Sequence, residues 1–220
     1  MRRGIDRRSL LSAAGLSLLF GSRLAAALES AGDRQRVTTR RGYIDCRYGQ
    51  LHYLRGAPAD GGTDKPTLVL LHQNPSSSVE YELLLRAMAE DREVIAFDTP
   101  GNGMSDWPPE PLDMAGYARA FSDGIANLSL GIDQPVDVFG YHTGTLLGAE
   151  LAIAEPERVG RLVLSGIPFR TPEERQERLD KLAKGPKLTE DGSEILATQR
   201  NLWDFVVTQR DPRVPLERAA

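Results

Sequence analysis

Short runs of apolar residues alternate with amphipathic stretches through the middle of the chain. The apolar runs predict strands buried on both faces of a sheet, and they read PTLVLLH, EVIAFD, VDVFG and RLVLSGIPF. The stretches between them predict helices, and these are SSSVEYELLLRAMAED, Leu112 to Leu130 and Thr143 to Ala154. Strands that alternate with helices predict an α/β fold, with a mostly parallel sheet covered by helices on both faces.

The segments on either side of this alternation have a different pattern. GYIDCRY and QLHYLRG, separated by a turn at Gly49, predict an antiparallel hairpin ahead of the first buried strand. After Phe169 the chain continues with two polar-rich helical stretches and no strand between them. The sequence therefore predicts a core over residues 28–169 and a separate helical segment over residues 170–220.

The first predicted helix gives the most detailed local expectation. Its serines at positions 76–78 are suited to capping the helix N-terminus through their side chains. Leu84, Ala87 and Met88 have the spacing of an apolar face that packs on the sheet.

Residues 1–27 have the layout of an export signal rather than of a folded element. Basic residues come first, an apolar stretch runs from Leu10 to Phe20, and small residues at positions 25–27 suit a cleavage site. Arg7 and Arg8 resemble a twin-arginine signal, which predicts a periplasmic or secreted protein. An amphipathic N-terminal helix is the alternative.

Composition narrows the classes of partner. With 40% hydrophobic and 26% charged residues the chain has the composition of a globular domain. A net charge of −4 provides no broad basic field, so nucleic acid is not an expected partner. Cys46 is the only cysteine, which excludes an internal disulfide and a thiolate metal site. No apolar run is long enough for a membrane span, so no membrane association is expected once the signal is removed.

Three polar motifs follow predicted strands, and ligands bind at the carboxyl ends of strands in sheets of this kind. They are LHQNP, FDTPGNGMSD and GYHTG, in that order along the chain. Together they resemble the α/β-hydrolase superfamily over about Tyr43 to Phe169, in particular its capped haloalkane dehalogenase and esterase-like members. The resemblance implies that residues 170–220 begin a helical cap over an active site.

The same resemblance implies a set of site residues. Gly140 and Gly144 would permit the sharp strand-to-helix turn that places His142 in the nucleophile position. The backbone N–H groups of Asn74 and Thr143 would form the oxyanion hole. The family uses serine, cysteine or aspartate at the tip of this turn, so His142 is a departure from its pattern.

A histidine at this tip has three possible roles. His142 could act as a nucleophile, because neutral imidazole is nucleophilic at pH 7, or it could act as a general base. The third role is that of a remnant of a lost catalytic site. The three histidines are His52, His72 and His142, so none follows the turn, where the family's base would come. The aspartates of the last segment are not convincing as the acid of a triad, and these are Asp180, Asp191, Asp204 and Asp211.

The other polar residues of the motifs have simpler interpretations. Asp98 and Ser105 are predicted to shape a turn through local hydrogen bonds, His72 to be a structural histidine, and His52 to lie at the surface. A competing hypothesis is that His72, Asp98 and His142 converge on a non-haem iron or zinc ion.

These observations lead to one functional hypothesis and its rivals. The chain is expected to be a hydrolase of a small-molecule substrate, most simply an ester, that needs no cofactor. Because the late base and acid are missing, we expect a truncated form, weakly active or inactive, with RLVLSGIPF as an exposed apolar edge. A natural short variant that dimerises through this edge is the alternative. The functional rivals are a non-catalytic small-molecule-binding protein and a lyase or dehalogenase that uses His142 as base.

Overall fold

A computed structural model describes residues 37–61, 63–131, 133–183, 185, 189–208, 212–213 and 216. The predicted export signal over residues 1–27 lies outside these residues. The chain divides into two compact units, one ending at Pro168 and the other beginning at Phe169. Each unit is described by itself. No helix among the described residues is long and apolar enough to cross a membrane.

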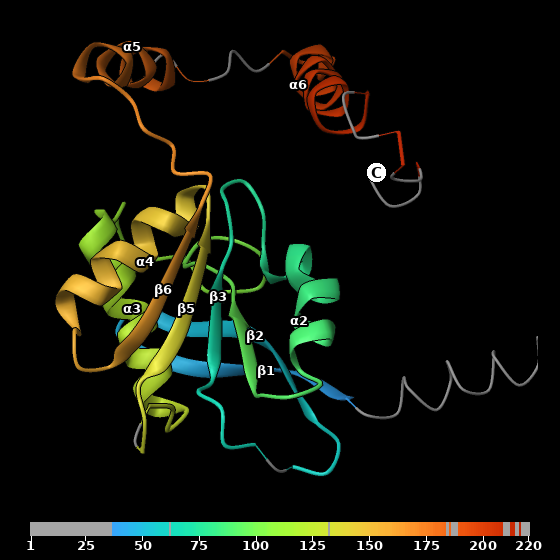
Figure 1. Cartoon of the computed structure of the whole chain (residues 1–220). Helices are drawn as coiled ribbons and strands as arrows, with labels where there is room; N and C mark the ends of the chain where they lie inside the picture. Colours follow the sequence, from blue (N-terminus) through green and yellow to red (C-terminus); the bar gives the residue numbers. More distant parts are fainter. Residues whose placement is uncertain are drawn as a thin grey trace, which may run out of the picture. The chain divides into compact units, whose positions relative to one another are not determined.

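The first unit is built on one mixed sheet of six strands (Figure 1). Its order is β1-β2-β4-β3-β5-β6, in which β2 is antiparallel to both of its neighbours, β1 and β4, and the last four strands run parallel to one another. The strands are β1 (Val37–Cys46), β2 (Gly49–Pro58), β3 (Leu68–Leu71), β4 (Val94–Phe97), β5 (Val136–Tyr141) and β6 (Val159–Ser165). The predicted hairpin and the predicted α/β fold with its mostly parallel sheet are both confirmed.

Helices cover both faces of this sheet (Figure 1). The helical elements of the first unit are η1 (Ser78–Tyr81), α2 (Glu82–Met88), α3 (Met114–Asn127) and α4 (Thr143–Ala154). Helices α3 and α4 pack on one face, and η1 with α2 packs on the other. Asp113 caps α3, because its side chain accepts a hydrogen bond from the Gly116 N–H.

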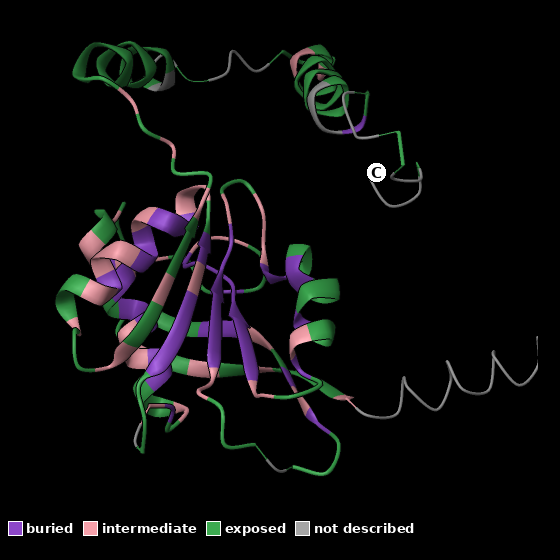
Figure 2. Cartoon of the chain, in the orientation of Figure 1, coloured by how far each residue is buried: buried purple, intermediate pink, exposed green. Residues whose placement is uncertain are grey.

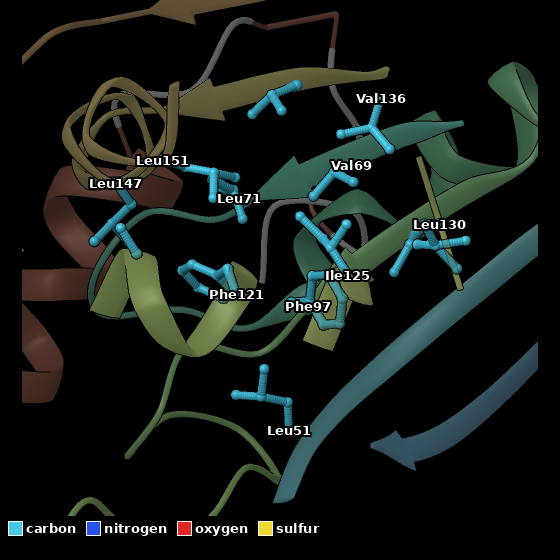
Figure 3. Packing of buried hydrophobic residues seen from close by; sticks show 13 residues of the cluster. Leu51, Val69, Leu71, Phe97, Phe121, Ile125, Leu130, Val136, Leu147 and Leu151 are labelled. Atoms are coloured by element: carbon cyan, nitrogen blue, oxygen red, sulfur yellow. The ribbon is translucent and has the colours of Figure 1, made fainter. Parts of the chain in front are cut away.

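Alternating residues of the central strands fill the two sides of the core. In β3, Val69 and Leu71 face α3 and α4, whereas Leu68 and Leu70 face α2. The larger cluster includes Phe97 and the residues contributed by the helices, which are drawn in Figure 3. The central strands are therefore apolar along their whole length because each face of the sheet is covered.

The first helical stretch differs from its prediction in two respects. It begins with the 3-10 turn η1, and the buried positions are Tyr81, Leu85 and Ala89. Of the predicted face, Met88 packs against the core cluster, whereas Leu84 and Ala87 are exposed, so the prediction was wrong for these two residues. Ser77 stands at the N-cap without a side-chain hydrogen bond, so the predicted serine cap was also wrong.

Strand β6 lies at one end of the described sheet, and Figure 2 shows much of its surface exposed. Val163 is 55% exposed and Leu164 is 37% exposed, whereas Leu162 packs against the larger core cluster. The expectation of an exposed apolar edge here is confirmed for the described part of the chain, and the expectation that the strand is buried on both faces is wrong.

The second unit contains helices α5 (Pro172–Ala183) and α6 (Ser193–Trp203), followed by the short π-helix η2 (Asp204–Thr208). The two predicted polar-rich helices are therefore present. Apolar side chains of α6 are exposed, among them Ile195, Leu196 and Trp203.

Candidate active site

The turn between β5 and α4 holds His142 in an uncommon backbone conformation. His142 has φ 48° and ψ −113°, and it stands at the N-cap of α4. A residue with a side chain rarely adopts a positive φ, and such conformations persist only where the surrounding structure enforces them. Sharp strand-to-helix turns of this kind present one side chain at the carboxyl end of the sheet.

Two glycines enforce the turn by allowing backbone to approach backbone. A Cβ atom at Gly140 would lie 2.2 Å from the Gly144 carbonyl oxygen. At Gly144 it would lie 1.9 Å from the carbonyl oxygen of Leu71 in β3. Neither position has room for a side chain, which is the physical reason for the G-x-H-x-G spacing.

Hydrogen bonds on both sides of His142 fix its backbone. Its N–H donates to the Ser165 carbonyl at the end of β6, at 2.9 Å. Its carbonyl accepts from the Thr145 N–H at 3.0 Å and from the Thr145 hydroxyl at 2.6 Å. The tip of the turn is therefore tied to the neighbouring strand and to the first turn of α4.

The predicted site residues meet at one hydroxyl group. Thr143 Oγ1 lies 3.2 Å from His142 Nδ1, and it accepts a hydrogen bond from the Asn74 N–H at 3.4 Å. A hydroxyl has one proton to donate and lone pairs to accept, so it can donate to His142 while accepting from Asn74. Sequence reasoning placed Thr143 here for its N–H group and missed the hydroxyl.

His72 has the structural role that the sequence predicted. It is buried, and its Nε2 accepts the Thr99 N–H at 2.9 Å. Its Nδ1 lies 2.6 Å from the Gln73 carbonyl oxygen, to which it donates. Because one ring nitrogen accepts and the other donates, the ring is neutral and joins the loops after β3 and β4.

His52 corrects its prediction as a surface residue. It is 5% exposed, and its Nδ1 lies 2.9 Å from Asp98 Oδ2. The side chain turns inward because β2 packs against the loop that follows β4. Ser105 completes the contact: it accepts from the His52 N–H at 2.9 Å and donates to the Asp98 carbonyl at 2.8 Å.

Asp98 acts as a buried acceptor that organises this loop. Its carboxylate accepts from the Ser78 N–H at 2.6 Å and from the Met104 N–H at 2.8 Å, besides pairing with His52. Burial acts to raise the pKa of Asp98, but the hydrogen bonds from Met104 and Ser78 and the proximity of His52 outweigh it and lower the pKa. The interpretation of Asp98 and Ser105 as turn-shaping residues is confirmed.

The hypothesis of a metal site made by His72, Asp98 and His142 finds no support in this arrangement. Both ring nitrogens of His72 and the Asp98 carboxylate are engaged in the hydrogen bonds given above. Within the residues that the structure describes, no three His, Cys, Asp or Glu side chains are grouped closely enough to hold a metal ion.

The mixed sheet, the helices on both faces and the glycine-bounded turn after β5 define an α/β-hydrolase. Residues 66–192 match the alpha/beta hydrolase fold family, and this match covers more than half of the chain. The chain belongs to that family.

Comparison with known proteins gives the same class. The chain is 30% identical over 148 residues to a proline iminopeptidase of Heyndrickxia coagulans, covering 66% of this chain and 49% of that protein. It is 34% identical over 125 residues to a haloalkane dehalogenase of Mycolicibacterium paratuberculosis, covering 55% of this chain and 39% of that protein. The chain thus spans about half or less of the length of these hydrolases.

Solved structures agree on the fold. Carboxylesterase CesB from Bacillus subtilis superposes with a TM-score of 0.54 at 22% identity, over 71% of this chain and 54% of that one. At this level of identity the likeness concerns the fold alone.

Proposed function

We propose that the chain carries the acyl-transfer centre of a hydrolase that acts on a small neutral substrate, most simply an ester, without a cofactor. One observation carries the proposal, which is the position of Thr143 Oγ1 between His142 Nδ1 and the Asn74 N–H. A hydroxyl beside a base and a backbone donor has the arrangement of an activated nucleophile next to an oxyanion hole.

The first step uses His142 as the base. Nδ1 takes the proton of the Thr143 hydroxyl while Oγ1 bonds to the ester carbonyl carbon, and the carbonyl electron pair moves onto its oxygen. The backbone N–H groups of Asn74 and Thr143 stabilise that oxyanion. Its collapse breaks the bond to the alcohol oxygen, which receives the proton from His142. The product is an acyl ester of Thr143 and the free alcohol.

Water then completes the cycle by the same groups. His142 takes a proton from water, the hydroxide attacks the acyl carbonyl, and the returning proton restores the Thr143 hydroxyl as the acid departs. Direct attack by the His142 imidazole, giving an acyl-imidazole, is the other route. The 3.2 Å contact with Thr143 favours the first route, because it places a hydroxyl proton within reach of Nδ1.

We expect turnover by the 220-residue chain to be weak or absent. No histidine follows His142 in the 220-residue sequence, and within the described residues its ring hydrogen-bonds only the Thr143 hydroxyl. One imidazole would therefore serve every proton transfer in this chain. Acylation by an activated ester is therefore a more sensitive readout than steady hydrolysis.

The test is incubation with p-nitrophenyl butyrate, followed by tandem mass spectrometry of the labelled peptide. The proposal predicts a butyryl group on Thr143. Thr143→Val and His142→Ala are expected to slow labelling by about 100-fold or more, whereas Thr143→Ser retains it. A butyryl group on His142 would replace the first route by the second. No labelled peptide and no nitrophenol release would overturn the function itself.

The rival functions predict different results in the same assay series. A binding protein on this fold would show ligand-dependent thermal stabilisation without any acylation. A dehalogenase or lyase that uses His142 as base would release halide, or an unsaturated product, from substrates that are not esters.

We also propose that the protein is exported to the periplasm or beyond, on the strength of residues 1–27 alone. Fusion of these residues to a reporter that is active only after export tests the proposal. Export that is lost when Arg7 and Arg8 are both changed to lysine is expected, and a reporter retained in the cytoplasm would refute it.

A further inference from the structure

A cavity of about 640 Å³ lies apart from the turn that carries His142. Its floor is the β1–β2 hairpin, one wall is formed by η1 and α2, and the loop after β4 closes one end. Of its lining residues only Ser77 belongs to the loop between β3 and η1 that also holds Asn74, and none comes from the turn between β5 and α4. Its volume is in the range of small-molecule sites, which is roughly 300–1,000 Å³.

The pairing of the hairpin explains which side chains form the floor. Arg41 pairs with Leu54, and Tyr43 pairs with His52. Residues directly opposite each other in an antiparallel pair share a face, and so do residues two apart along a strand. The rings of Tyr43 and His52 confirm this, with centroids 5.3 Å apart. The hydrogen bond between His52 Nδ1 and Asp98 Oδ2 holds the His52 ring in place in this floor.

The walls of the cavity carry exposed apolar side chains. Val79 and Met104 are each 64% exposed and Tyr43 is 49% exposed, although all three line the cavity. Leu54 and Leu85 extend this apolar surface inward. A group of solvent-exposed apolar residues around a concave surface is typical of a ligand-binding site.

The charged groups that line the cavity are of both signs, although the whole chain has a net charge of −4. Arg40, Arg41 and Arg86 line it, against Glu82 and Asp98. Asp98 is buried and bonded on both oxygens, so it does not face a ligand as a free charge.

The arginines differ in how far they are neutralised. Glu82 forms an ion pair with Arg86 at 3.2 Å. In the described part of the chain, neither Arg40 nor Arg41 has a carboxylate within 4.0 Å. Arg41 shares the face of Tyr43, Leu54 and His52, so its guanidinium group, unpaired with any carboxylate of the described residues, stands at the edge of an apolar cavity. This arrangement suits a carboxylate with an apolar body.

We propose that this cavity binds an organic anion of that class, with a medium-chain carboxylate as its simplest form. The anionic head lies at Arg41, and the apolar tail lies against Leu54, Leu85 and Val79. This site is separate from the acyl-transfer centre, and its test does not depend on catalysis.

The experiment is titration of the full chain with octanoate, followed by calorimetry and by amide chemical shifts. Octan-1-ol and octylammonium are matched probes with the same tail and a neutral or positive head. Octanoate is expected to bind about tenfold or more tightly than either, with shifts centred on Tyr43, Val79 and Met104. Equal affinity for the three probes would overturn the proposal. So would shifts centred on Val163 and Ile167, which are exposed apolar residues elsewhere.

Variants that change the charge around the cavity give a second test, because some are expected to weaken octanoate binding and others to tighten it. Arg41→Glu is expected to weaken octanoate binding about tenfold, whereas Arg119→Glu on α3 makes the same change in net charge and has no effect. Glu82→Gln releases Arg86 and is expected to tighten binding by about two- to threefold. If Arg41→Glu weakens binding no more than Arg119→Glu does, the proposal fails.

Discussion

A Cβ atom at Gly144 would lie 1.9 Å from the Leu71 carbonyl oxygen, closer than any real contact. Gly148, one turn further along α4, differs in kind, because its nearest neighbour is the flexible Leu162 side chain at 3.2 Å. At the scale of single residues, the position of His142 therefore depends on backbone packing around glycines and very little on the histidine itself.

This contrast predicts unequal effects of the same substitution within one helix. Gly144→Ala is expected to lower the free energy of unfolding by about 3 kcal/mol or more, because a backbone carbonyl cannot move aside. Gly148→Ala is expected to change it by less than about 1 kcal/mol, since alanine favours helix and Leu162 can shift. Urea unfolding of both variants measures the difference, and equal effects would mean that the turn is not packed as described.

Some residues of the site were predictable and others were not. The turn that presents His142 was predictable, because its two glycines and the histidine lie within five consecutive residues, GYHTG. His52 was assigned to the surface because its partner Asp98 is 46 positions away, and a hairpin pattern cannot show such a contact. The Thr143 hydroxyl was missed because its neighbour Asn74 comes from a different strand end.

At the scale of elements, the strands were easier to predict than the faces of the helices. A strand apolar throughout needs only its own sequence to identify it, as in β3 and β4. The phase of α2 could not be predicted, because η1 precedes it and rotates the buried face to Tyr81, Leu85 and Ala89. Strand β6 is apolar like β3, but a strand's own sequence cannot indicate what covers it.

The exposed apolar surface of β6 predicts self-association of the chain. Val163→Lys places a charge on this strand and is expected to reduce association, because charged residues on edge strands oppose strand pairing. Thr38→Lys, on the exposed strand at the opposite end of the sheet, is the matched control. Sedimentation velocity across a range of concentrations measures the effect. A wild-type chain that is monomeric throughout would contradict the prediction.

At the scale of the whole molecule, the Asp98 contacts join segments that are far apart in the chain. They connect the hairpin through His52, the start of η1 through Ser78 and the loop after β4 through Met104. Removing this carboxylate affects several elements together, so its effect belongs to the stability of the unit as a whole.

Asp98→Asn is expected to lower the free energy of unfolding by about 3 kcal/mol at pH 7. Because the folded-state pKa of Asp98 is lowered, the stability it contributes is complete above the ordinary carboxyl pKa of about 3.9 and is lost as the pH falls through the folded-state value. The difference between wild type and variant therefore stays constant from pH 7 to about pH 5 and shrinks below about pH 4. Urea titrations at several pH values measure it.

Asp123→Asn is the control for this prediction. The Asp123 pKa is also lowered, chiefly by its hydrogen bonds with Arg47, but this pair lies nearer the surface. Its loss is expected to lower the free energy of unfolding by about 1 kcal/mol or less. Equal losses for the two variants would show that Asp98 does not hold the unit together.

The strained turn at residue 142 has one consequence for how such a protein changes over time. Gly140, Gly144 and the Ser165 carbonyl hold the backbone there, so the identity of the tip residue is free to vary without rebuilding the fold. A histidine codon becomes an aspartate codon by one base change. The same scaffold can therefore exchange one reactive group for another in a single mutational step, and its chemistry can diverge faster than its structure.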